Sequence, residues 1–323
     1  MSDAVMHQSA VDAPISEFVR RLSGRLSPDA VLRENEPLAK KTTIGVGGPA
    51  RCYSEPASIE DLRVLLREAR GCGVPVFLLG RGSNVIVPDD GVPGLVLRLQ
   101  SSRWREIAAR EDGRLWAGAG ARLRKLCGEA CRLGLGGLEF LEGIPGTVGG
   151  ALRMNAGAMN GWFFDVVEEV RLMTYAGEEK VFLKDQLHYD YRVCHELLNT
   201  IALGAVIAAP GREEEAAIRR RLAEFQEKRT GAQPKESSAG CIFKNPPGVS
   251  AGRIIDELGL KGKRIGDAEV SLMHGNFIIN RGAATASEVI QLVRELRDEV
   301  RRRKNFEMEP EVLLFGKQWS DVL

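Results

Sequence analysis

The order of elements around a short glycine loop constrains this chain most. Residues 74–79, VPVFLL, are typical of a short buried strand, and the loop GRGSN at 80–84 follows at once. Residues 85–99, VIVPDDGVPGLVLRL, predict further strand broken by prolines. A Walker loop or a Rossmann turn requires a helix here, because a helix N-terminus holds the phosphate. The sequence therefore argues against both folds, and any phosphate bound by the loop would be held by consecutive backbone N–H groups.

The segment 137–161, GLEFLEGIPGTVGGALRMNAGAMNG, is unusually rich in glycine. So many glycines are unfavourable inside a helix or strand without a special reason. A flexible linker would be polar and rich in serine, whereas this segment contains Leu, Ile, Val, Met and Phe. We therefore expect a packed backbone cradle for a large flat or anionic ligand. The glycine pair Gly118 and Gly120 precedes an expected helix but lacks a third glycine, so it is weak evidence for a nucleotide site.

Length and charge restrict the class of protein. The length of 323 residues indicates two or three domains. The net charge of +1 gives no electrostatic field that would attract nucleic acid. No apolar run approaches the length of a membrane span, and no secretion signal is visible, so a cytoplasmic location without membrane insertion is expected. Of the six cysteines, Cys127 and Cys131 could clip a metal, but one shared helix face is the simpler interpretation. No metal site is expected.

Periodicity predicts helices and strands along the rest of the chain. Ser58 to Asp61 offers a capping box for a helix that stops at Gly71. The expected strands and helices include these segments: a helix at 15–26, strands at 166–175, 179–182, 189–194 and 201–209, a charged helix at 213–229 whose Arg219–Arg221 run faces solvent, a helix at 251–258, a strand at 276–280, a helix at 287–303 and a strand at 311–315.

The stretch SSAGCIFKNP at 237–246 combines a thiol, an ammonium and an amide. This mixture is unusual for a core strand and typical of a functional site. Cys241 is therefore either a reacting group or a buried cysteine with polar neighbours, because free cysteine is among the most buried residue types.

Seven segments together resemble the UDP-N-acetylenolpyruvoylglucosamine reductases, flavoenzymes of peptidoglycan precursor and cell wall synthesis. They are, in family order, TTIGVGG, LLGRGSNVIV, GLEFLEGIPGTVGGALRMNAGA, YR-V-C, AGCIFKNP, HGNFIIN and EPEVLLFG, from about Thr42 to Gly316. The resemblance implies an α+β fold: a two-subdomain FAD-binding module of the vanillyl-alcohol-oxidase type, then an α+β substrate domain. The expected bounds are an extension at 1–30, FAD-binding subdomains at 31–98 and 99–211, and a substrate domain at 212–323.

The resemblance also implies bound FAD and NADPH as the hydride donor to a monomeric enzyme that reduces UDP-N-acetylglucosamine enolpyruvate. The residues expected around FAD are Gly80, Arg81, Gly82, Ser83, Asn84, Val85, Gly143, Ile144, Pro145, Gly146, Thr147, Gly149, Gly150, Met154, Asn155, Gly157 and Ala158. The residues expected to bind substrate are Tyr191, Arg229, Lys244 and Asn245, and His274 is a weaker candidate.

Three catalytic roles follow from the resemblance. Arg192 is the cation beside the substrate carboxylate, and Glu311 is a carboxyl group that helps the enolate. Cys241 stands where many members carry a serine proton donor. Glu309 is the alternative to Glu311, but Pro310 between them argues that the last strand begins at Glu311.

Residues 193–242 leave little room for the tyrosine-bearing loop that some members have, so the chain resembles the compact subtype. Two alternatives remain open. One is an FAD-dependent sugar or lactone oxidase of the same fold, which would react with oxygen. The other is a nucleotide-binding regulator that keeps only the GRGSN loop.

Overall fold

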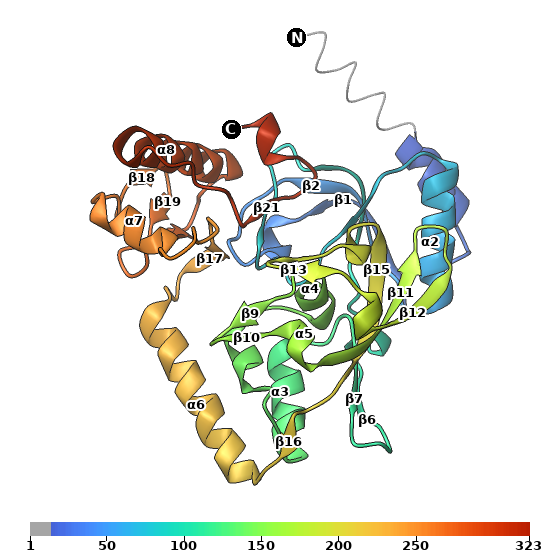
Figure 1. The fold of residues 1–323 in the computed structure, drawn as a ribbon. Helices are drawn as coiled ribbons and strands as arrows, with labels where there is room; N and C mark the ends of the chain where they lie inside the picture. The colour runs from blue at the N-terminus through green and yellow to red at the C-terminus, as the bar shows by residue number, and fades with distance from the viewer. Residues whose placement is uncertain (1–13) are drawn as a thin grey trace. The chain divides into compact units, whose positions relative to one another are not determined.

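The computed structural model describes residues 14–323 and divides into two compact units (Figure 1). Unit 1 contains the described residues up to Glu34, Arg51–Gly80 and Gly94–Lys228, and unit 2 contains Asn35–Ala50, Arg81–Pro93 and Arg229–Leu323. The division falls within the glycine loop, between Gly80 and Arg81, so this loop contributes to both units. The domain bounds expected from the sequence stay a prediction. Within 14–323, no helix is both long and apolar enough to cross a membrane.

Unit 1 contains an antiparallel five-stranded sheet in the order β12-β11-β15-β7-β6 (Figure 1). The strands are β6 (Ile107–Ala109), β7 (Leu115–Gly118), β11 (Val167–Thr174), β12 (Glu179–Leu183) and β15 (Thr200–Ile207). β15, TIALGAVI, is apolar and buried after its first residue, as suits a strand in the middle of the sheet. Its residues share one core with α3 (Leu123–Arg132), α4 (Val148–Arg153) and α5 (Phe163–Val166).

A second sheet has the order β1-β2-β5-β3. Its strands are β1 (Val31–Pro37), β2 (Pro49–Glu55), β3 (Val76–Leu78) and β5 (Val92–Leu97). α2 (Ile59–Gly71) begins at the predicted capping box of Ser58 and Asp61. A helix that is described from residue 14 ends at Leu22, before the predicted end at residue 26, and its Phe18 packs in the same core as Leu62 and Leu65 of α2.

The remaining elements of unit 1 are short, apart from one long helix. They are η2 (Arg103–Arg105), β8 (Leu135–Gly136), η3 (Glu139–Gly143), β9 (Gly157–Ala158), β10 (Gly161–Trp162), η4 (Lys184–Gln186), β13 (Tyr189–Asp190), β14 (Val193–Cys194), η5 (Glu196–Leu198), β16 (Gly211–Arg212) and α6 (Glu215–Ala232), which ends in unit 2. One prediction for α6 is wrong. Arg221 does not simply face solvent, because its Nε atom lies 3.0 Å from Oε1 of the buried Glu139.

Unit 2 is built on a four-stranded antiparallel sheet in the order β17-β20-β19-β18. Its elements are η1 (Ala39–Lys41), β4 (Val85–Ile86), β17 (Ser237–Cys241), α7 (Ala251–Glu257), β18 (Arg264–Ile265), β19 (Ala268–Val270), β20 (Phe277–Asn280), α8 (Ala286–Lys304), β21 (Leu313–Leu314) and η6 (Trp319–Asp321). Apolar residues of α8 recur at helical spacing and are buried in the same core as the strands, which fixes this helix on the sheet.

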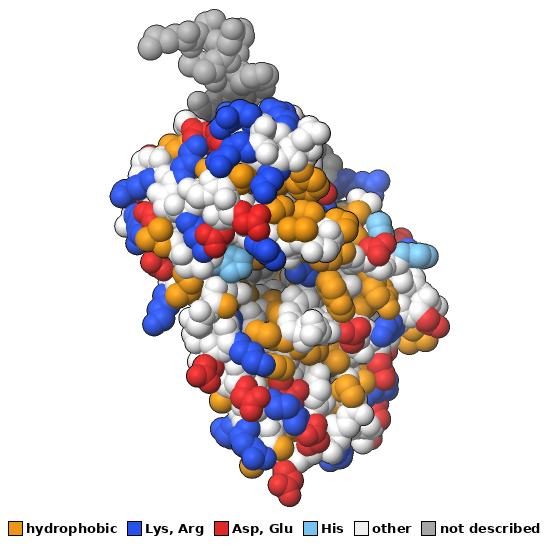
Figure 2. All heavy atoms as spheres, turned by 60° about the vertical axis from the view of Figure 1, so that its left-hand side comes forward, with side chains coloured by type: hydrophobic (Ala, Val, Ile, Leu, Met, Phe, Trp, Pro, Cys, Tyr) orange, Lys and Arg blue, Asp and Glu red, His pale blue; other side chains and the backbone are white. Residues whose placement is uncertain are grey.

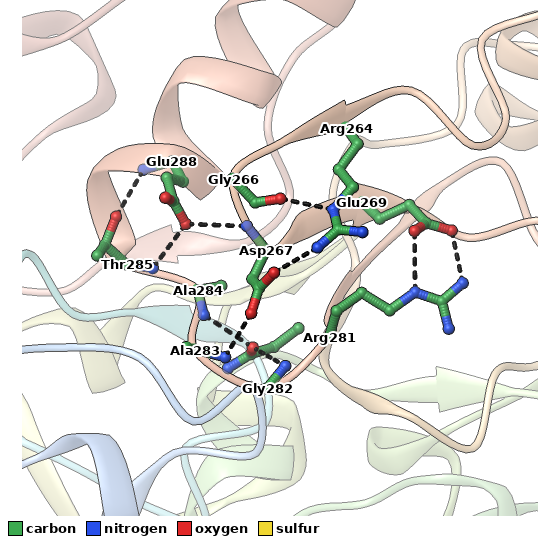
Figure 3. A network of polar contacts seen from close by, with 11 residues as sticks. Arg264, Gly266, Asp267, Glu269, Arg281, Gly282, Ala283, Ala284, Thr285 and Glu288 are labelled. Carbon is green, nitrogen blue, oxygen red and sulfur yellow. Dashed lines mark hydrogen bonds and ion pairs between the residues drawn. The ribbon is translucent and has the colours of Figure 1, made fainter.

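A polar network joins the β18–β19 hairpin, β20 and the start of α8 (Figure 3). Arg281 donates two hydrogen bonds to Glu269, at 2.7 and 2.9 Å, and this ion pair lowers the pKa of the Glu269 carboxyl. Glu288 accepts from the backbone N–H groups of Asp267 and Thr285. These contacts fix the sheet edge to the helix N-terminus.

Lys and Arg side chains are interspersed with Asp and Glu on the face seen in Figure 2. Most of the arginines near the end of α8 take part in ion pairs, for example Arg301 with Asp298 and Arg302 with Glu299. This mixture agrees with the small net charge and gives no single-signed surface on that face.

Candidate functional site

The glycine loop is held firmly at its start, in unit 1. The Arg98 Nε atom donates a hydrogen bond to the Gly80 carbonyl oxygen at 3.0 Å. A Cβ atom added to Gly80 would lie 3.1 Å from Thr147 Oγ1, so the two residues pack closely. The structure therefore brings together two segments that the sequence assigned to the cofactor.

In unit 2 the glycine loop continues, and the carbonyl groups of Gly82 and Asn84 accept hydrogen bonds from backbone N–H groups of this unit. Gly82 has a φ of +73°, and its carbonyl oxygen accepts from the N–H of Thr43 at 2.9 Å. A Cβ atom at Gly82 would lie 2.4 Å from the Lys41 carbonyl oxygen, so only glycine fits here. The Asn84 carbonyl accepts from the N–H of Leu313 at 3.0 Å, and β4 pairs with β21 in parallel. A strand thus follows the loop, as the sequence predicted.

The glycine-rich segment contains a short helix that sequence reasoning missed. α4 begins after Thr147, whose hydroxyl accepts from the N–H of Gly150 at 3.4 Å. The N–H of Gly149 donates to the carbonyl of Ala119 at 2.8 Å, and a Cβ at Gly149 would lie 3.1 Å from Ala119. Glycine at 149 therefore lets α4 pack closely on the Gly118–Ala121 turn, which supports the helix.

Two other glycines of this segment would accept a Cβ atom without a clash. A Cβ atom at Gly143 would lie 3.7 Å from Ala158, and one at Gly146 would lie 3.6 Å from Leu123 and 3.8 Å from Ile144. These are ordinary van der Waals separations, and neither glycine has a positive φ. Neither packing within unit 1 nor backbone conformation requires glycine at these positions, so the prediction that they approach a flat ligand gives the reason for glycine here.

Asn155, one of the residues predicted at the cofactor, connects three parts of unit 1. Its buried amide accepts from the N–H of Phe164 at 3.2 Å and donates to the carbonyl of Asp190 at 3.2 Å. The ring of Phe164 in turn stacks on Tyr189, with 4.3 Å between ring centroids. These contacts join the segment around Asn155 to the β13–β14 hairpin.

The predicted strand at 189–194 is wrong in one respect. The segment forms a tight hairpin, β13–β14, and Tyr191 and Arg192 occupy its turn. Arg192 has a φ of +62°, in the left-handed region that favours glycine or asparagine. The turn places Arg192 at the tip of the hairpin, where a continuous strand would have kept it within a sheet.

Trp162 lies beside this turn and was not singled out by sequence reasoning. The Arg192 guanidinium carbon lies 5.3 Å from the centroid of the Trp162 ring and 4.7 Å from that of Tyr191. The two rings meet edge to face, with centroids 5.7 Å apart. No local pattern in the sequence indicates this contact, because Trp162 and Arg192 are distant along the chain.

β17 contains a β-bulge immediately before Cys241. Its pairing with β20 shifts register between Ser238 and Cys241, and Gly240 has a φ of +79°, which a glycine bulge needs. A Cβ atom at Gly240 would lie 3.5 Å from the Ser83 carbonyl oxygen. The bulge therefore lies beside the glycine loop, and Cys241 follows it with its side chain partly exposed.

Asn276 holds the chain that follows Cys241. Its buried amide accepts from the N–H of Phe243 at 2.9 Å and donates to the Phe243 carbonyl at 2.8 Å. Its own carbonyl accepts from the N–H of Ile242 at 2.9 Å. Asn276 belongs to the HGNFIIN segment, so the sequence resemblance contained this residue without revealing its role.

Glu311 is joined to the same chain segment. Its N–H donates to the Ile242 carbonyl at 2.8 Å, and Asn84 Nδ2 donates to the Glu311 carbonyl at 3.3 Å. The side chain of Glu309 instead forms an ion pair with Lys244 and is 70% exposed. The backbone of Glu311 thus lies beside Ile242, the residue after Cys241, whereas the side chain of Glu309 is paired with Lys244.

Three further candidates have structural partners. Asn245 Oδ1 accepts from the N–H of Ala251 at the start of α7, and Arg229 Nε donates to Gln233 Oε1 at 3.2 Å. Burial lowers the pKa of His274, and its Nδ1 accepts from the N–H of Asn276 at 3.2 Å. The Nδ1 atom of His274 is thus engaged by the backbone of unit 2. Among the described residues, no three His, Cys, Asp or Glu side chains are grouped to hold a metal ion.

We expect Asn276→Ala to lower the free energy of unfolding by about 2–4 kcal/mol, because it leaves the buried N–H and C=O groups of Phe243 without their partner. The matched control is Asn245→Ala, which removes one partly buried hydrogen bond and should cost less than about 1 kcal/mol. Urea denaturation followed by circular dichroism measures both. An equal, small loss in the two variants would show that Asn276 does not hold this segment.

Comparisons with known proteins agree with this arrangement. A model of the UDP-N-acetylenolpyruvoylglucosamine reductase C-terminal domain matches residues 233–315, and an FAD binding domain model matches residues 50–182. The UDP-N-acetylenolpyruvoylglucosamine reductase of Moorella thermoacetica is 41% identical over 302 residues, which cover 92% of this chain and 98% of that protein. The chain belongs to the UDP-N-acetylenolpyruvoylglucosamine reductase family. The Thermus thermophilus reductase is 44% identical over 269 residues, covering 83% of this chain and 96% of its own.

The crystal structure of the Thermus caldophilus UDP-N-acetylenolpyruvylglucosamine reductase is similar, with a TM-score of 0.74, 41% identity and coverage of 88% of this chain and 98% of that one. The predicted fold class, an α+β FAD-binding module of the vanillyl-alcohol-oxidase type followed by an α+β domain, is confirmed. As a UDP-N-acetylenolpyruvoylglucosamine reductase family member, the chain is an FAD-containing oxidoreductase. Membership removes the regulator alternative. The roles of individual residues stay predictions.

Proposed function

We propose that the chain reduces UDP-N-acetylglucosamine enolpyruvate to UDP-N-acetylmuramate with NADPH, through Arg192, Cys241 and Glu311. One hydride is added to the terminal CH₂ carbon of the enolpyruvyl group and one proton to C2, so the enol ether becomes a lactyl ether. Bound FAD supplies the hydride chemistry that side chains cannot perform. The observation that carries the assignment is the network of unit 2: the Gly240 bulge before Cys241 lies beside Ser83 of the glycine loop, Asn84 Nδ2 donates to the Glu311 carbonyl, and the Glu311 N–H donates to the Ile242 carbonyl.

The glycine loop and the 143–158 segment would hold FAD. The carbonyl of Gly82 is directed at Thr43, and in a trans peptide the N–H of the next residue points the opposite way. The N–H of Ser83 is thus directed away from Thr43, as an N–H donor to a diphosphate needs to be. The absence of a side chain at Gly143 and Gly146 would let the flat ring system approach their backbone closely.

Each catalytic residue meets one demand of the reaction. Addition of hydride to CH₂ leaves negative charge on C2 and its carboxylate, which the Arg192 guanidinium stabilises. The carboxyl group of Glu311 shares its proton with the developing enolate oxygen. The Cys241 Sγ–H then delivers the proton to C2, and the net reaction consumes one hydride and one proton.

The substrate's nucleotide part requires cations and polar groups. Lys244 offers its ammonium group, which Glu309 holds in an exposed ion pair. Arg229 follows in the last turns of α6, and Asn245 has one side-chain oxygen committed to α7. Tyr191 is 41% exposed at the hairpin turn and offers a ring face for the sugar or base.

The decisive test is a coupled assay of the purified protein with NADPH and UDP-N-acetylglucosamine enolpyruvate. We expect a yellow protein whose flavin bleaches with NADPH without oxygen and recolours on addition of the enolpyruvyl substrate. A flavin that fails to bleach with NADPH and instead turns over sugars with oxygen would favour the sugar oxidase. Product identity is read by mass spectrometry, as a gain of two hydrogen atoms.

We expect Gly146→Val to fold but to lose FAD, because its Cβ fits the protein while its methyl groups enter the space proposed for the cofactor. The matched control is Gly128→Val on α3, where an added Cβ meets no atom within 4 Å. Flavin absorbance per protein and the circular dichroism spectrum are measured for both. Retention of stoichiometric FAD in Gly146→Val would remove this segment from the cofactor site.

We also infer that the enzyme works in the cytoplasm as a monomer, without nucleic acid. The small net charge of +1 gives no field that would attract nucleic acid. Analytical ultracentrifugation of the holoenzyme tests the oligomeric state.

A further inference from the structure

Arg192 occupies a backbone position that is unfavourable for arginine. Its φ of +62° lies in the left-handed region, which costs a non-glycine residue about 1–2 kcal/mol. A glycine or asparagine would relieve this strain. The arginine side chain therefore has a use that offsets this cost. A long side chain on a tight turn has many rotamers, so other groups must restrict it.

Two aromatic rings restrict this side chain. The guanidinium carbon lies within cation–π distance of Trp162, at 5.3 Å, and of Tyr191, at 4.7 Å. The rings stand at 71° to each other, so they form two sides of a corner around the guanidinium group. Contact with two rings restricts the positions that the guanidinium group can take, and its N–H groups are directed within its own plane.

Trp162, unlike Tyr191, is anchored away from the turn. It pairs with Gly157 between β10 and β9, and a Cβ atom at Gly157 would lie 2.7 Å from Trp162 Cε3. The N–H of Trp162 donates to Asp165 Oδ2 at 2.7 Å. The indole therefore lies on the Gly157 backbone. This gives Gly157, predicted at the cofactor, a structural reason of its own: a side chain there would displace the indole.

The hairpin is held by the same part of unit 1. Asn155 donates to the carbonyl of Asp190, and Tyr189 stacks on Phe164. The segment 155–164 thus supports both the base of the hairpin, through Asn155 and Phe164, and the guanidinium group at its tip, through Trp162.

We propose that Trp162 is the positioning residue of Arg192: its ring holds the guanidinium group in the plane that receives the carboxylate of the enolpyruvyl substrate. This inference rests on the proposed function, because it takes Arg192 as the carboxylate-binding cation. A carboxylate binds arginine in plane through two N–H groups, and loss of the plane weakens binding in the ground state and the transition state. Trp162 itself does not need to touch the substrate.

The chain offers a matched control. Trp116 on β7 also lies over a glycine, since a Cβ atom at Gly204 would lie 2.5 Å from its ring, and the Arg171 guanidinium carbon is 5.2 Å from its centroid. Trp116→Leu therefore removes the same kind of tryptophan–glycine packing and the same cation–π contact in unit 1, without involving Arg192.

The test compares Trp162→Leu, Trp162→Phe and Trp116→Leu as holoenzymes. We expect kcat/KM for the enolpyruvyl substrate to fall about 5- to 30-fold in Trp162→Leu and about two- to threefold in Trp162→Phe, which keeps a ring face. Trp116→Leu should stay within about twofold of the wild type. FAD content should be unchanged in all three, and the Kd of UDP-N-acetylmuramate, measured by calorimetry, should rise in parallel with the loss of kcat/KM.

A double-mutant cycle with Arg192→Lys shows whether Trp162 acts through Arg192. In the Arg192→Lys background, Trp162→Leu should lower kcat/KM further by less than about twofold, because the guanidinium plane is already lost. Equal effects of Trp162→Leu and Trp116→Leu, or an effect of Trp162→Leu that persists in the Arg192→Lys background, would overturn the inference. If Trp162→Leu fails to retain FAD, the same cycle with Trp162→Phe decides. A wild-type protein that does not reduce the enolpyruvyl substrate would contradict the proposed function instead.

Discussion

Cys241→Ala is expected to lower the rate at which the enolpyruvyl substrate is reduced by about 10²–10⁴-fold, the usual contribution of a general acid. The variant should still bind FAD and oxidise one equivalent of NADPH, because the proton at C2 is needed only after hydride addition. Stopped-flow absorbance of the flavin separates the two half-reactions. The bulge at Gly240 motivates this prediction, since it re-aims the strand beside the glycine loop at the position of Cys241.

The matched variant is Cys241→Ser, which keeps a proton donor of similar size and should retain substantial activity. A thiol has a reference pKa of about 8.5, so it donates its proton below that pH and loses this ability as the pH rises. The wild-type rate should therefore fall at alkaline pH. The serine variant should not show this decrease, because a hydroxyl stays protonated. Wild-type turnover by Cys241→Ala would mean that the thiol only packs and that water or Glu311 gives the proton.

Glu311→Gln should slow reduction of the enolpyruvyl substrate by about 100-fold or more and leave reduction of the flavin by NADPH nearly unchanged. The amide keeps the shape of the side chain and the backbone contacts to Ile242 and Asn84, so the loss reports on the carboxyl group itself. The same stopped-flow experiment measures both half-reactions.

Glu309→Gln is the control for that variant. It removes the exposed ion pair with Lys244, which is worth about 0–1 kcal/mol, so the effect should stay below about fivefold. Equal slowing of both half-reactions by Glu311→Gln would make Glu311 a structural residue. A large loss in Glu309→Gln alone would transfer the role to Glu309.

Local patterns in the sequence predicted the elements well where one strong periodicity dominated. The capping box at Ser58, the buried strand β15 and the long helix α8 all appear close to their expected positions. The strand after the glycine loop, which excluded the Rossmann turn, is also present. The prediction failed at 189–194, where alternating residues suggested one strand, because a turn with a positive φ at Arg192 has no glycine to mark it.

The sequence by itself determined the family, the glycine loop and the set of candidate residues, because each depends on residue types at short spacing. Only the tertiary structure decided which candidate residues lie close to one another. It joined Glu311 to Ile242, placed the Gly240 bulge beside Ser83 and set Trp162 against Arg192. The physical reason is that these contacts link segments far apart along the chain. They arise from strand register and packing, which no local periodicity encodes.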